Sequence, residues 1–294
     1  MCGIFAYINN QPISDEQKTI LEKEFYKSQM RGPDNSISKH SKYVYLGFHR
    51  LSINGLENGN QPMEHPEDKD ITLICNGEIY NYKELAAQYN CNLVTGSDCE
   101  IILHLYKLLG FKETIQKLDG VFGIVLYDNR TQKVFAARDP IGVRSLFIGT
   151  TSTSFAIASE MKSLHNISNN IIQFPVGSIW DMDIGDHDMN TFEKYYTMDT
   201  IYNDSSLTIN NEAIIMDKIY QSLDNAVTKR LMSDKPIGCL LSGGFDSSIV
   251  AALLSKHFPE HTLKTFSIGL EGSPDLKYAR MVADFIKSDH HEVV

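Results

Sequence analysis

Met1-Cys2-Gly3-Ile4-Phe5-Ala6-Tyr7-Ile8 opens the chain, and the run from Cys2 to Ile8 is short and apolar, which is typical of a strand. If Met1 is removed, Cys2 carries a thiol and a free α-amine on one residue. An α-amine with an ordinary pKa near 8 can act, directly or through one water, as the base that activates the thiol. The alternative, an ordinary core cysteine, stays open on this stretch alone.

Short apolar or alternating runs continue to about residue 180, and few helical patterns lie between them. Strands clustered in this way favour an antiparallel α+β layered fold over a doubly wound one. The further strands are predicted at 43–53, 71–75, 121–128, 133–138, 145–149 and 155–158, and the helices at 15–30 and 98–109.

A second domain is predicted after a polar, turn-rich connection at about 191–211. It begins with a helix whose apolar residues are spaced four apart, followed by an apolar run typical of a buried parallel strand. Its βαβαβ order predicts the start of an α/β parallel sheet. Because parallel sheets usually have about five or six strands, we expect the sequence to be a fragment of a longer chain. The predicted elements are helix 212–232, strand 236–241, helix 246–258, strand 263–270, helix 276–286 and strand 291–294.

Composition narrows the class of protein. The 294 residues fit about two domains, and the net charge of -10 argues against a nucleic acid bound through a broad basic face. Five cysteines without a CxxC pair indicate neither a disulfide framework nor a zinc site, so a reducing cytoplasm fits best. No apolar run approaches the length of a membrane span, and no set of metal ligands is predicted.

The loop Ser242-Gly243-Gly244-Phe245-Asp246-Ser247-Ser248 lies between a predicted strand and a predicted helix. A glycine-rich loop at a helix N-terminus exposes backbone N–H groups at the positive end of the helix dipole, which suits phosphate or pyrophosphate. A plain helix N-cap made by Asp246 or Ser247 is the alternative. The spacing of a Walker A loop and its lysine are absent.

This loop resembles the PP-loop of the ATP pyrophosphatases, which adenylate a carboxylate and release pyrophosphate; their usual form has leucine where Phe245 stands. The resemblance implies that ATP is a cofactor and that Mg²⁺ is held mainly through the ATP phosphates. The residues that it implies for ATP and pyrophosphate are Leu241, Ser242, Gly243, Gly244, Asp246, Ser247 and Ile268.

Six motifs of the first domain, in this order, resemble those of the class II glutamine amidotransferases, an Ntn-hydrolase family. The resemblance implies a four-layer αββα sandwich and a glutaminase domain over 1–190, followed by the linker 191–211 and an incomplete synthetase domain over 212–294. The motifs are Met1-Cys2-Gly3-Ile4, Arg31-Gly32-Pro33-Asp34, the run 47–53, the run 75–81, Gly96-Ser97-Asp98-Cys99-Glu100 and Ala137-Arg138-Asp139-Pro140-Ile141-Gly142.

The same resemblance assigns roles in releasing ammonia from glutamine. Cys2 would be the nucleophile, with Asn76 and Gly77 as the oxyanion pair. Each position also has a plainer interpretation: a hairpin turn at Asn76-Gly77, a solvated charge at Arg50, a helix N-cap at Asp98 and a surface acid at Glu78. His49 is interpreted as structural. The residues implied for glutamine are Arg50, Leu51, Ile53, Asn76, Gly77, Glu78 and Asp98.

Both motif sets in one chain make it similar to the glutamine-hydrolysing asparagine synthetase family, which implies an ATP-dependent amidoligase. Its reaction takes glutamine-derived ammonia, aspartate and ATP to asparagine, glutamate, AMP and pyrophosphate. The family's second glycine-rich loop has no counterpart before Val294, so we expect glutamine hydrolysis without asparagine synthesis. The predicted partners are therefore these small molecules, and a homodimer stays open.

Two other functions stay open. One is a non-catalytic or regulatory relative that binds glutamine without turnover. The other is an amidotransferase with a different acceptor, although the PP-loop argues against it. A glutamine-analogue electrophile distinguishes the first from an enzyme, because it labels Cys2 only where the thiol is activated.

Overall fold

The computed structural model describes residues 1–184, 191–197 and 212–294. These residues belong to two compact units, Met1–Asn203 and Asp204–Val294, and each is described by itself. Most of the predicted linker, residues 198–211, lies outside the described residues.

The first unit consists of two stacked sheets with helices on their outer faces. Its elements are β1 Gly3–Asn9, α1 Asp15–Tyr26, η1 Gln29–Arg31, β2 Asn35–His40, β3 Val44–Arg50, β4 Met63–His65, β5 Asp68–Ile79, α2 Tyr82–Tyr89, α3 Glu100–Leu109, α4 Phe111–Lys117, β6 Gly120–Asp128, β7 Lys133–Arg138, β8 Phe147–Thr150, β9 Ser154–Ala158, η2 Met161–Ser163, β10 Asn170–Gln173, β11 Ser178–Asp183 and β12 Glu193–Lys194.

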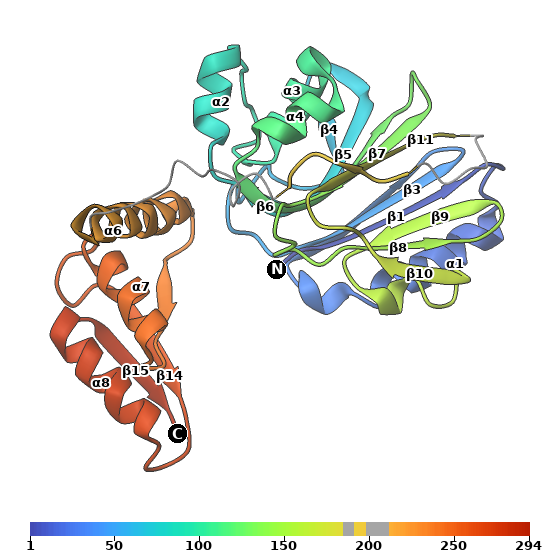
Figure 1. Ribbon diagram of the computed structural model, residues 1–294. Coiled ribbons are helices and arrows are strands. Elements are labelled where there is room, and N and C mark those ends of the chain that lie inside the picture. The colour runs from blue at the N-terminus through green and yellow to red at the C-terminus, as the bar shows by residue number, and fades with distance from the viewer. Residues whose placement is uncertain (185–190, 198–211) are drawn as a thin grey trace. The chain divides into compact units, whose positions relative to one another are not determined.

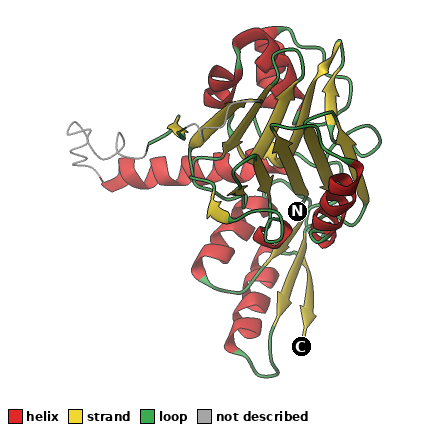
Figure 2. Cartoon of the chain, turned by 90° about the vertical axis from the view of Figure 1, so that its right-hand side faces the viewer, coloured by secondary structure: helices red, strands yellow, loops and turns green. Residues whose placement is uncertain are grey.

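The sheets have the strand orders β10-β8-β9-β1-β3-β2 and β12-β11-β7-β6-β5-β4, and neighbouring strands run antiparallel. Helix α1 lies outside the first sheet, and α2, α3 and α4 lie outside the second (Figure 1). Strands stacked between helices are also visible after a quarter turn (Figure 2). The predicted four-layer αββα arrangement is confirmed.

Both faces of β1 are buried because each contributes to a different core. Ile4 and Ile8 point between the two sheets, where they join Trp180 of β11. Phe5 points the other way and packs with Phe25 of α1. Burying each such side chain contributes about 1.5–3 kcal/mol, so the residue after Cys2 begins a strand that is fixed on both sides.

Several predicted elements have different bounds in the structure, and two of the differences affect the site. The strand expected at 71–75 is β5, which extends to Ile79, so Asn76 and Gly77 lie inside a ladder with β6 and the hairpin-turn interpretation is wrong. The helix expected at 15–30 ends at Tyr26. The chain then brings Gly32 against the backbone of His49, where a Cβ would lie only 2.3 Å from the His49 carbonyl carbon.

The second unit is a small parallel sheet in the order β13-β14-β15, packed on one face by helices. The expected parallel start is confirmed, but the expectation of a fully buried first strand is wrong: Leu240 is 82% exposed and Ile268 of the next strand is 79% exposed. The described helices cover only the other face. The elements are α6 Glu212–Thr228, η3 Lys229–Leu231, β13 Gly238–Leu240, α7 Phe245–Ser255, β14 Lys264–Ile268, α8 Pro274–Ile286 and β15 Asp289–Val293.

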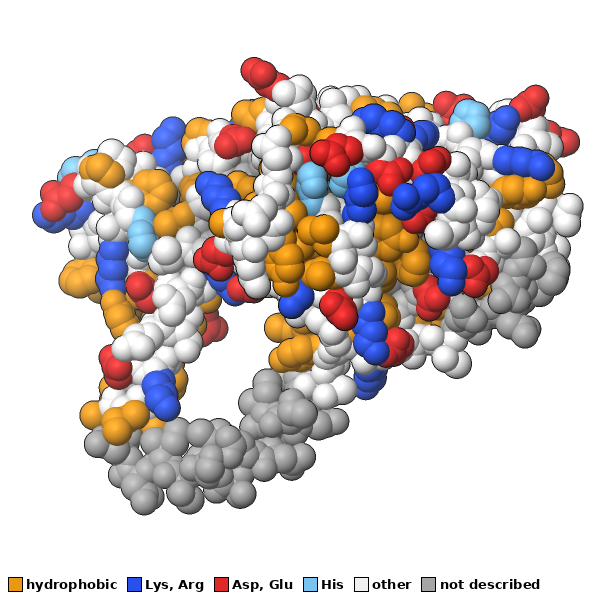
Figure 3. Space-filling model, turned by 90° about the horizontal axis from the view of Figure 1, so that it is seen from above, with side chains coloured by type: hydrophobic (Ala, Val, Ile, Leu, Met, Phe, Trp, Pro, Cys, Tyr) orange, Lys and Arg blue, Asp and Glu red, His pale blue; other side chains and the backbone are white. Residues whose placement is uncertain are grey.

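Acidic and basic side chains are interspersed over the face seen from above, without a patch of one sign (Figure 3). Among the described residues, the structure has no helix of sufficient length and hydropathy to span a bilayer.

Candidate active site

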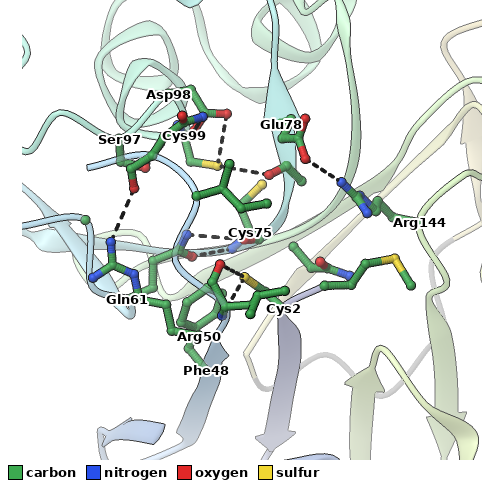
Figure 4. A pocket seen from close by; sticks show the side chains of 17 residues that line it. Cys2, Phe48, Arg50, Gln61, Cys75, Glu78, Ser97, Asp98, Cys99 and Arg144 are labelled. Carbon is green, nitrogen blue, oxygen red and sulfur yellow. Dashed lines mark hydrogen bonds and ion pairs between the residues drawn. The ribbon is translucent and has the colours of Figure 1, made fainter. Parts of the chain in front are cut away.

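A pocket of about 140 Å³ lies in the first unit at the start of β1. It brings together all of the residues predicted for glutamine, although they come from four separate parts of the sequence (Figure 4). The predicted residues that line it are Cys2, Arg50, Leu51, Ile53, Asn76, Gly77, Glu78 and Asp98.

The thiol of Cys2 contacts the backbone of Leu51, the first residue after β3. The Leu51 N–H donates to Cys2 Sγ at 3.4 Å, and Sγ lies 3.5 Å from the Leu51 carbonyl oxygen. Burial raises the pKa of this thiol, while the Leu51 contact lowers it. The thiol is therefore held in place but needs a base or a nearby positive charge to ionise.

The α-amine of the chain also lines this pocket, as part of Met1. Burial lowers its pKa, and the charges of Arg31 and Arg144 act in the same direction. The Arg31 guanidinium also donates from Nε to the Cys2 carbonyl oxygen at 2.9 Å, which fixes the backbone of residue 2. An amine with a lowered pKa is more often neutral at pH 7, the form that can accept a proton.

Asn76 presents an uncommitted donor to the pocket. It is only 2% exposed, yet its Nδ2 has no hydrogen-bond partner among the described residues. A buried polar group without a partner costs roughly 1–3 kcal/mol, so native proteins rarely keep one without a ligand or a bound water. The Asn76 side chain lies on the same face of β5 as Ile74, which packs between the sheets.

The backbone N–H of Gly77 is a second donor, because it is not directed at β6. Phe122, opposite Gly77, turns its N–H and carbonyl groups to Asp139, so the Gly77 N–H points away from β6, toward the edge of the sheet. At that edge β4 pairs only with the first half of β5.

Side chains fill this edge on either side of Gly77. The Gln61 amide pairs with both backbone groups of Cys75, at 2.6 and 3.2 Å, and the Asp98 carboxylate accepts the Ile79 N–H at 2.7 Å. Among the described residues, no side chain accepts a hydrogen bond from the Gly77 N–H in this way. A Cβ on Gly77 would lie 2.5 Å from the Val121 oxygen, so only glycine fits here.

Arg50 is a buried organiser of the pocket wall, and the solvated-charge interpretation is wrong. Arg50 is 5% exposed, and its guanidinium donates to the Asn60 Oδ1 at 2.8 Å and the Gly55 carbonyl oxygen at 2.6 Å. Longer bonds of 3.2 and 3.3 Å reach the carbonyl oxygens of Leu56 and Asn54. Arg50 therefore shapes the loop 54–60 and presents its positive charge at the pocket.

Asp98 is not a helix cap, because α3 begins at Glu100 and no side chain caps it. Its carboxylate instead accepts the Ile79 N–H and, at 3.4 Å, the Asn54 Nδ2. Burial raises the pKa of Asp98 to about 6, although these two bonds oppose the shift. Glu78 is not a free surface acid either, because Arg144 pairs with it at 2.9 Å.

His49 lies beside Arg50 in sequence but takes no place in the pocket lining. Its ring is fully buried and stacks on Phe25 with 3.9 Å between the ring centroids. Its ring nitrogens lie 2.9 Å from the Phe25 carbonyl oxygen and 2.7 Å from the Ser36 hydroxyl. This is the environment of a structural histidine, as the sequence predicts.

Sequence reasoning missed several residues of the pocket. Gln61 and Asn54 are polar residues in an irregular segment, with no spacing pattern to mark them. Arg144 had a signal, because it follows two residues after the motif that ends at Gly142. The remaining residues that line the pocket are Met1, Phe48, Asn54, Gly59, Gln61, Cys75, Ser97, Cys99 and Arg144.

The loop 242–248 of the second unit has an open helix end. Gly244 is the N-cap of α7 and no side chain caps the helix, so the interpretation as a cap by Asp246 or Ser247 is wrong. The hydroxyls of Ser247 and Ser248 turn back to the Gly244 carbonyl oxygen, at 3.1 and 2.7 Å. Gly243 has a φ of 77°, and a Cβ there would lie 2.4 Å from the Ala279 nitrogen.

A second pocket, of about 240 Å³, borders this loop. It joins three of the residues predicted for ATP, namely Leu241, Ser242 and Ile268. The remaining predicted residues, Gly243, Gly244, Asp246 and Ser247, follow directly in the loop and first turn of α7. An uncapped helix end beside an apolar pocket fits a phosphate joined to a flat apolar group.

The family model of the glutamine amidotransferase domain matches residues 1–217. The chain belongs to this family. The asparagine synthase model matches the remaining residues, 218–294. Each of the two family models contains one of the two candidate sites of this glutamine amidotransferase chain.

Curated relatives of this glutamine amidotransferase chain are glutamine-hydrolysing asparagine synthetases. Those of Zea mays and Oryza sativa are 38% and 37% identical over 99% and 100% of the chain. A probable asparagine synthetase of Dictyostelium discoideum is 38% identical over 99%. The chain spans about half the length of these relatives, 50%, 49% and 54% respectively.

Solved structures with a similar fold include glutamine phosphoribosylpyrophosphate amidotransferase from B. subtilis, with a TM-score of 0.55 and 15% identity. The match covers 99% of this chain and 81% of that one. The allosteric regulatory enzyme of purine biosynthesis matches with a TM-score of 0.56 and 14% identity, over 99% of this chain and 80% of that one. At these identities the likeness shows the fold alone.

Proposed function

We propose that the first unit hydrolyses the side-chain amide of glutamine, with Cys2 as the nucleophile. One observation carries the proposal: the Cys2 thiol shares a pocket with the Asn76 Nδ2, which has no partner among the described residues, and with Gly77, whose N–H points away from β6. Two donors beside a nucleophile are what a tetrahedral intermediate needs, because its oxygen becomes negative as the sulfur attacks.

The reaction proceeds through a thioester. Once Met1 is removed, the α-amine of Cys2 takes the thiol proton while Sγ bonds to the amide carbon of glutamine. The carbonyl oxygen accepts the donors of Asn76 and Gly77 as it becomes negative. The carbon–nitrogen bond then breaks, and ammonia leaves with the proton from the amine. Water hydrolyses the thioester, which releases glutamate and restores the thiol.

The other end of glutamine needs a positive and a negative partner. We assign the α-carboxylate to the Arg50 guanidinium, with Leu51 and Ile53 on the loop that follows it. The α-ammonium is assigned to Asp98, with Glu78 as a second acid. Burial raises the pKa of Asp98 to about 6, which still lies below 7, so its carboxylate is mostly ionised at pH 7, as binding an ammonium requires.

For the whole protein we propose asparagine synthesis from aspartate, ATP and glutamine-derived ammonia. The open end of α7 is the proposed ATP site, and ATP would supply the adenylate that activates a carboxylate. Mg²⁺ would be held mainly by phosphate oxygens, with Asp246 as the carboxylate nearest the loop. We place the glutaminase domain at 1–190, the linker at 191–211 and the synthetase domain from 212 onward, in the cytoplasm.

The test combines glutamine turnover with labelling of Cys2. The purified 294-residue chain, shown by intact mass to lack Met1, should release glutamate and ammonia from glutamine without ATP. A glutamine-analogue electrophile should modify Cys2, located by peptide mass spectrometry, and abolish turnover. Cys2→Ser should lose both activity and labelling while it still binds glutamine.

The controls separate the rival functions. Glutamine binding without turnover or labelling would support a regulatory glutamine-binding protein and overturn our proposal. Retention of Met1 should abolish turnover, because the base then lies one residue away from the thiol.

A further inference from the structure

The loop that joins β7 to β8 is built around one buried carboxylate. Asp139 is 1% exposed, and its Oδ1 accepts the N–H groups of Ile141, Gly142 and Val143 at 3.2, 2.6 and 2.9 Å. Its Oδ2 accepts the Arg144 N–H at 3.0 Å. Four backbone donors of this loop, which join the Phe122 N–H on the same carboxylate, fix the course of the loop up to Arg144.

A buried guanidinium holds the carbonyl groups of the same loop. Arg138 is 3% exposed and donates to the Arg144 carbonyl oxygen at 2.8 Å and to the Gly142 carbonyl oxygen at 2.9 Å. Gly142 has a φ of 74°, and a Cβ there would lie 2.4 Å from the Val176 side chain. Asp139 and Arg138 together, here called the loop clamp, fix the backbone of Arg144 through its N–H and its carbonyl oxygen.

This fixed loop delivers the Arg144 side chain to the glutamine pocket. The guanidinium pairs with Glu78 at 2.9 Å, and the two side chains are 12% and 21% exposed (Figure 4). Arg144 Nε is buried and finds no hydrogen-bond partner within the described ranges 1–184, 191–197 and 212–294. An ion pair alone does not need a clamped loop, and surface pairs contribute little to stability.

The charge of Arg144 acts on the thiol of Cys2. Burial is the largest influence and raises the pKa of this thiol, while the positive charge of Arg144 lowers it. A positive charge in the same pocket favours the thiolate, which is the form of sulfur that attacks. The other titratable and charged groups around this site are Arg31, Arg50, Cys75, Glu78, Asp98 and Cys99.

We propose that Arg144 is a positioning residue of the amidohydrolase site, with its backbone held by the loop clamp so that its guanidinium fixes Glu78 and keeps a positive charge in the pocket of the Cys2 thiol. This proposal rests on the proposed glutamine hydrolysis for its role in turnover. The electrostatic part concerns the thiol alone and can be measured without glutamine.

The experiment measures the reactivity of Cys2 against pH in the Met1-free chain. Iodoacetamide alkylates the thiolate, and peptide mass spectrometry follows Cys2 separately from Cys75 and Cys99. For Arg144→Gln we expect the midpoint of the alkylation profile to move to higher pH, with Cys2 alkylated roughly threefold more slowly at pH 7, the size expected for one partly screened charge. Arg144→Lys should restore most of the rate, because lysine keeps the charge.

Arg130→Gln is the matched control. Arg130 also pairs with carboxylates, those of Asp68 at 2.8 Å and Asp128 at 3.2 Å, but it lies outside the pocket lining. Its variant should keep the wild-type profile. An unchanged midpoint in Arg144→Gln, or a loss that lysine does not restore, would overturn the proposal.

Glu78→Gln gives an independent test if Arg144→Gln fails to fold. Removing the partner acid leaves the guanidinium charge less neutralised, so the midpoint should move to lower pH; a shift to higher pH would contradict the role of Arg144. Glutamine turnover is then measured on the same samples. If the variants show the alkylation shifts but the wild-type chain shows no turnover, the glutaminase function is disproved and the charge effect on Cys2 stands.

Discussion

Replacing Asn76 with alanine distinguishes the effect of this side chain on the stability of the fold from its proposed effect on glutamine turnover. In the folded chain the buried Nδ2 of Asn76 has no partner among the described residues, which costs roughly 1–3 kcal/mol. Alanine removes that donor next to an existing cavity, so little new void forms. We therefore expect the free energy of unfolding of Asn76→Ala to stay within about 1 kcal/mol of wild type or to rise.

Turnover should respond in the opposite way. Removing one oxyanion donor raises the barrier by about 2.7–4 kcal/mol, so kcat for glutamine should fall roughly 100- to 1000-fold with Cys2 alkylation unchanged. Urea unfolding and a coupled glutamate assay measure the two quantities. Asn81→Ala is the control: Asn81 pairs with Lys117 and Asp119 at 2.9 and 3.0 Å, so it should lose stability and keep kcat. An Asn76→Ala enzyme with kcat within threefold of wild type would refute the oxyanion role.

Three further perturbations have definite expected outcomes. Asp98 has a raised pKa, so its ionisation lowers the free energy of unfolding as pH rises through about 6. Asp98→Asn should therefore have a free energy of unfolding up to roughly 3 kcal/mol higher than wild type at pH 8 and little different at pH 4, as measured by thermal unfolding. The same variant should bind glutamine at least about 100-fold more weakly. For Glu100, burial raises the pKa, but hydrogen bonds from His104, Thr95 and the Val94 backbone outweigh it and lower the pKa to about 2. The resulting stability is complete above pH 4.5 and disappears toward pH 2, so Glu100→Gln should unfold about 2–3 kcal/mol more easily at pH 7, and an equal loss at pH 2 would contradict this. Gly77→Ala should lose both stability and turnover, because its Cβ would lie 2.5 Å from the Val121 oxygen, and a wild-type melting temperature would count against this geometry.

The sequence predicts the layers of the first unit because its strands are short apolar runs with buried faces. It fails at β5, where Asn76-Gly77 has the composition of a hairpin turn but continues the strand. The nine residue pairs that β5 forms with β6 outweigh the local preference of Asn76-Gly77 for a turn. Local sequence also fails to predict that the first helix ends at Tyr26, because the approach of Gly32 to His49 depends on a strand that follows later in the chain.

The site shows a similar division. Motifs mark Arg50 and Asp98 as residues of the pocket, but no sequence pattern identifies the residues that they contact. Gln61 contacts Cys75 across fourteen positions of sequence, and Asn54 contacts Asp98 across forty-four. Such contacts follow from the fold, and an irregular segment carries no periodicity from which to predict them.

The edge of β5 explains why a site forms at this point of the fold. A strand edge inside a protein needs a partner for every backbone group, and β4 is too short to supply them. Gln61 and Asp98 satisfy the positions on either side of Gly77 with side chains, which leaves one backbone donor open between them. Since both flanking positions are rigidly paired, the Gly77 N–H cannot turn away to find another acceptor. The opening is therefore an oriented donor that is already formed in the folded chain, and in the proposed reaction its energetic cost would fall on folding and not on the catalytic step.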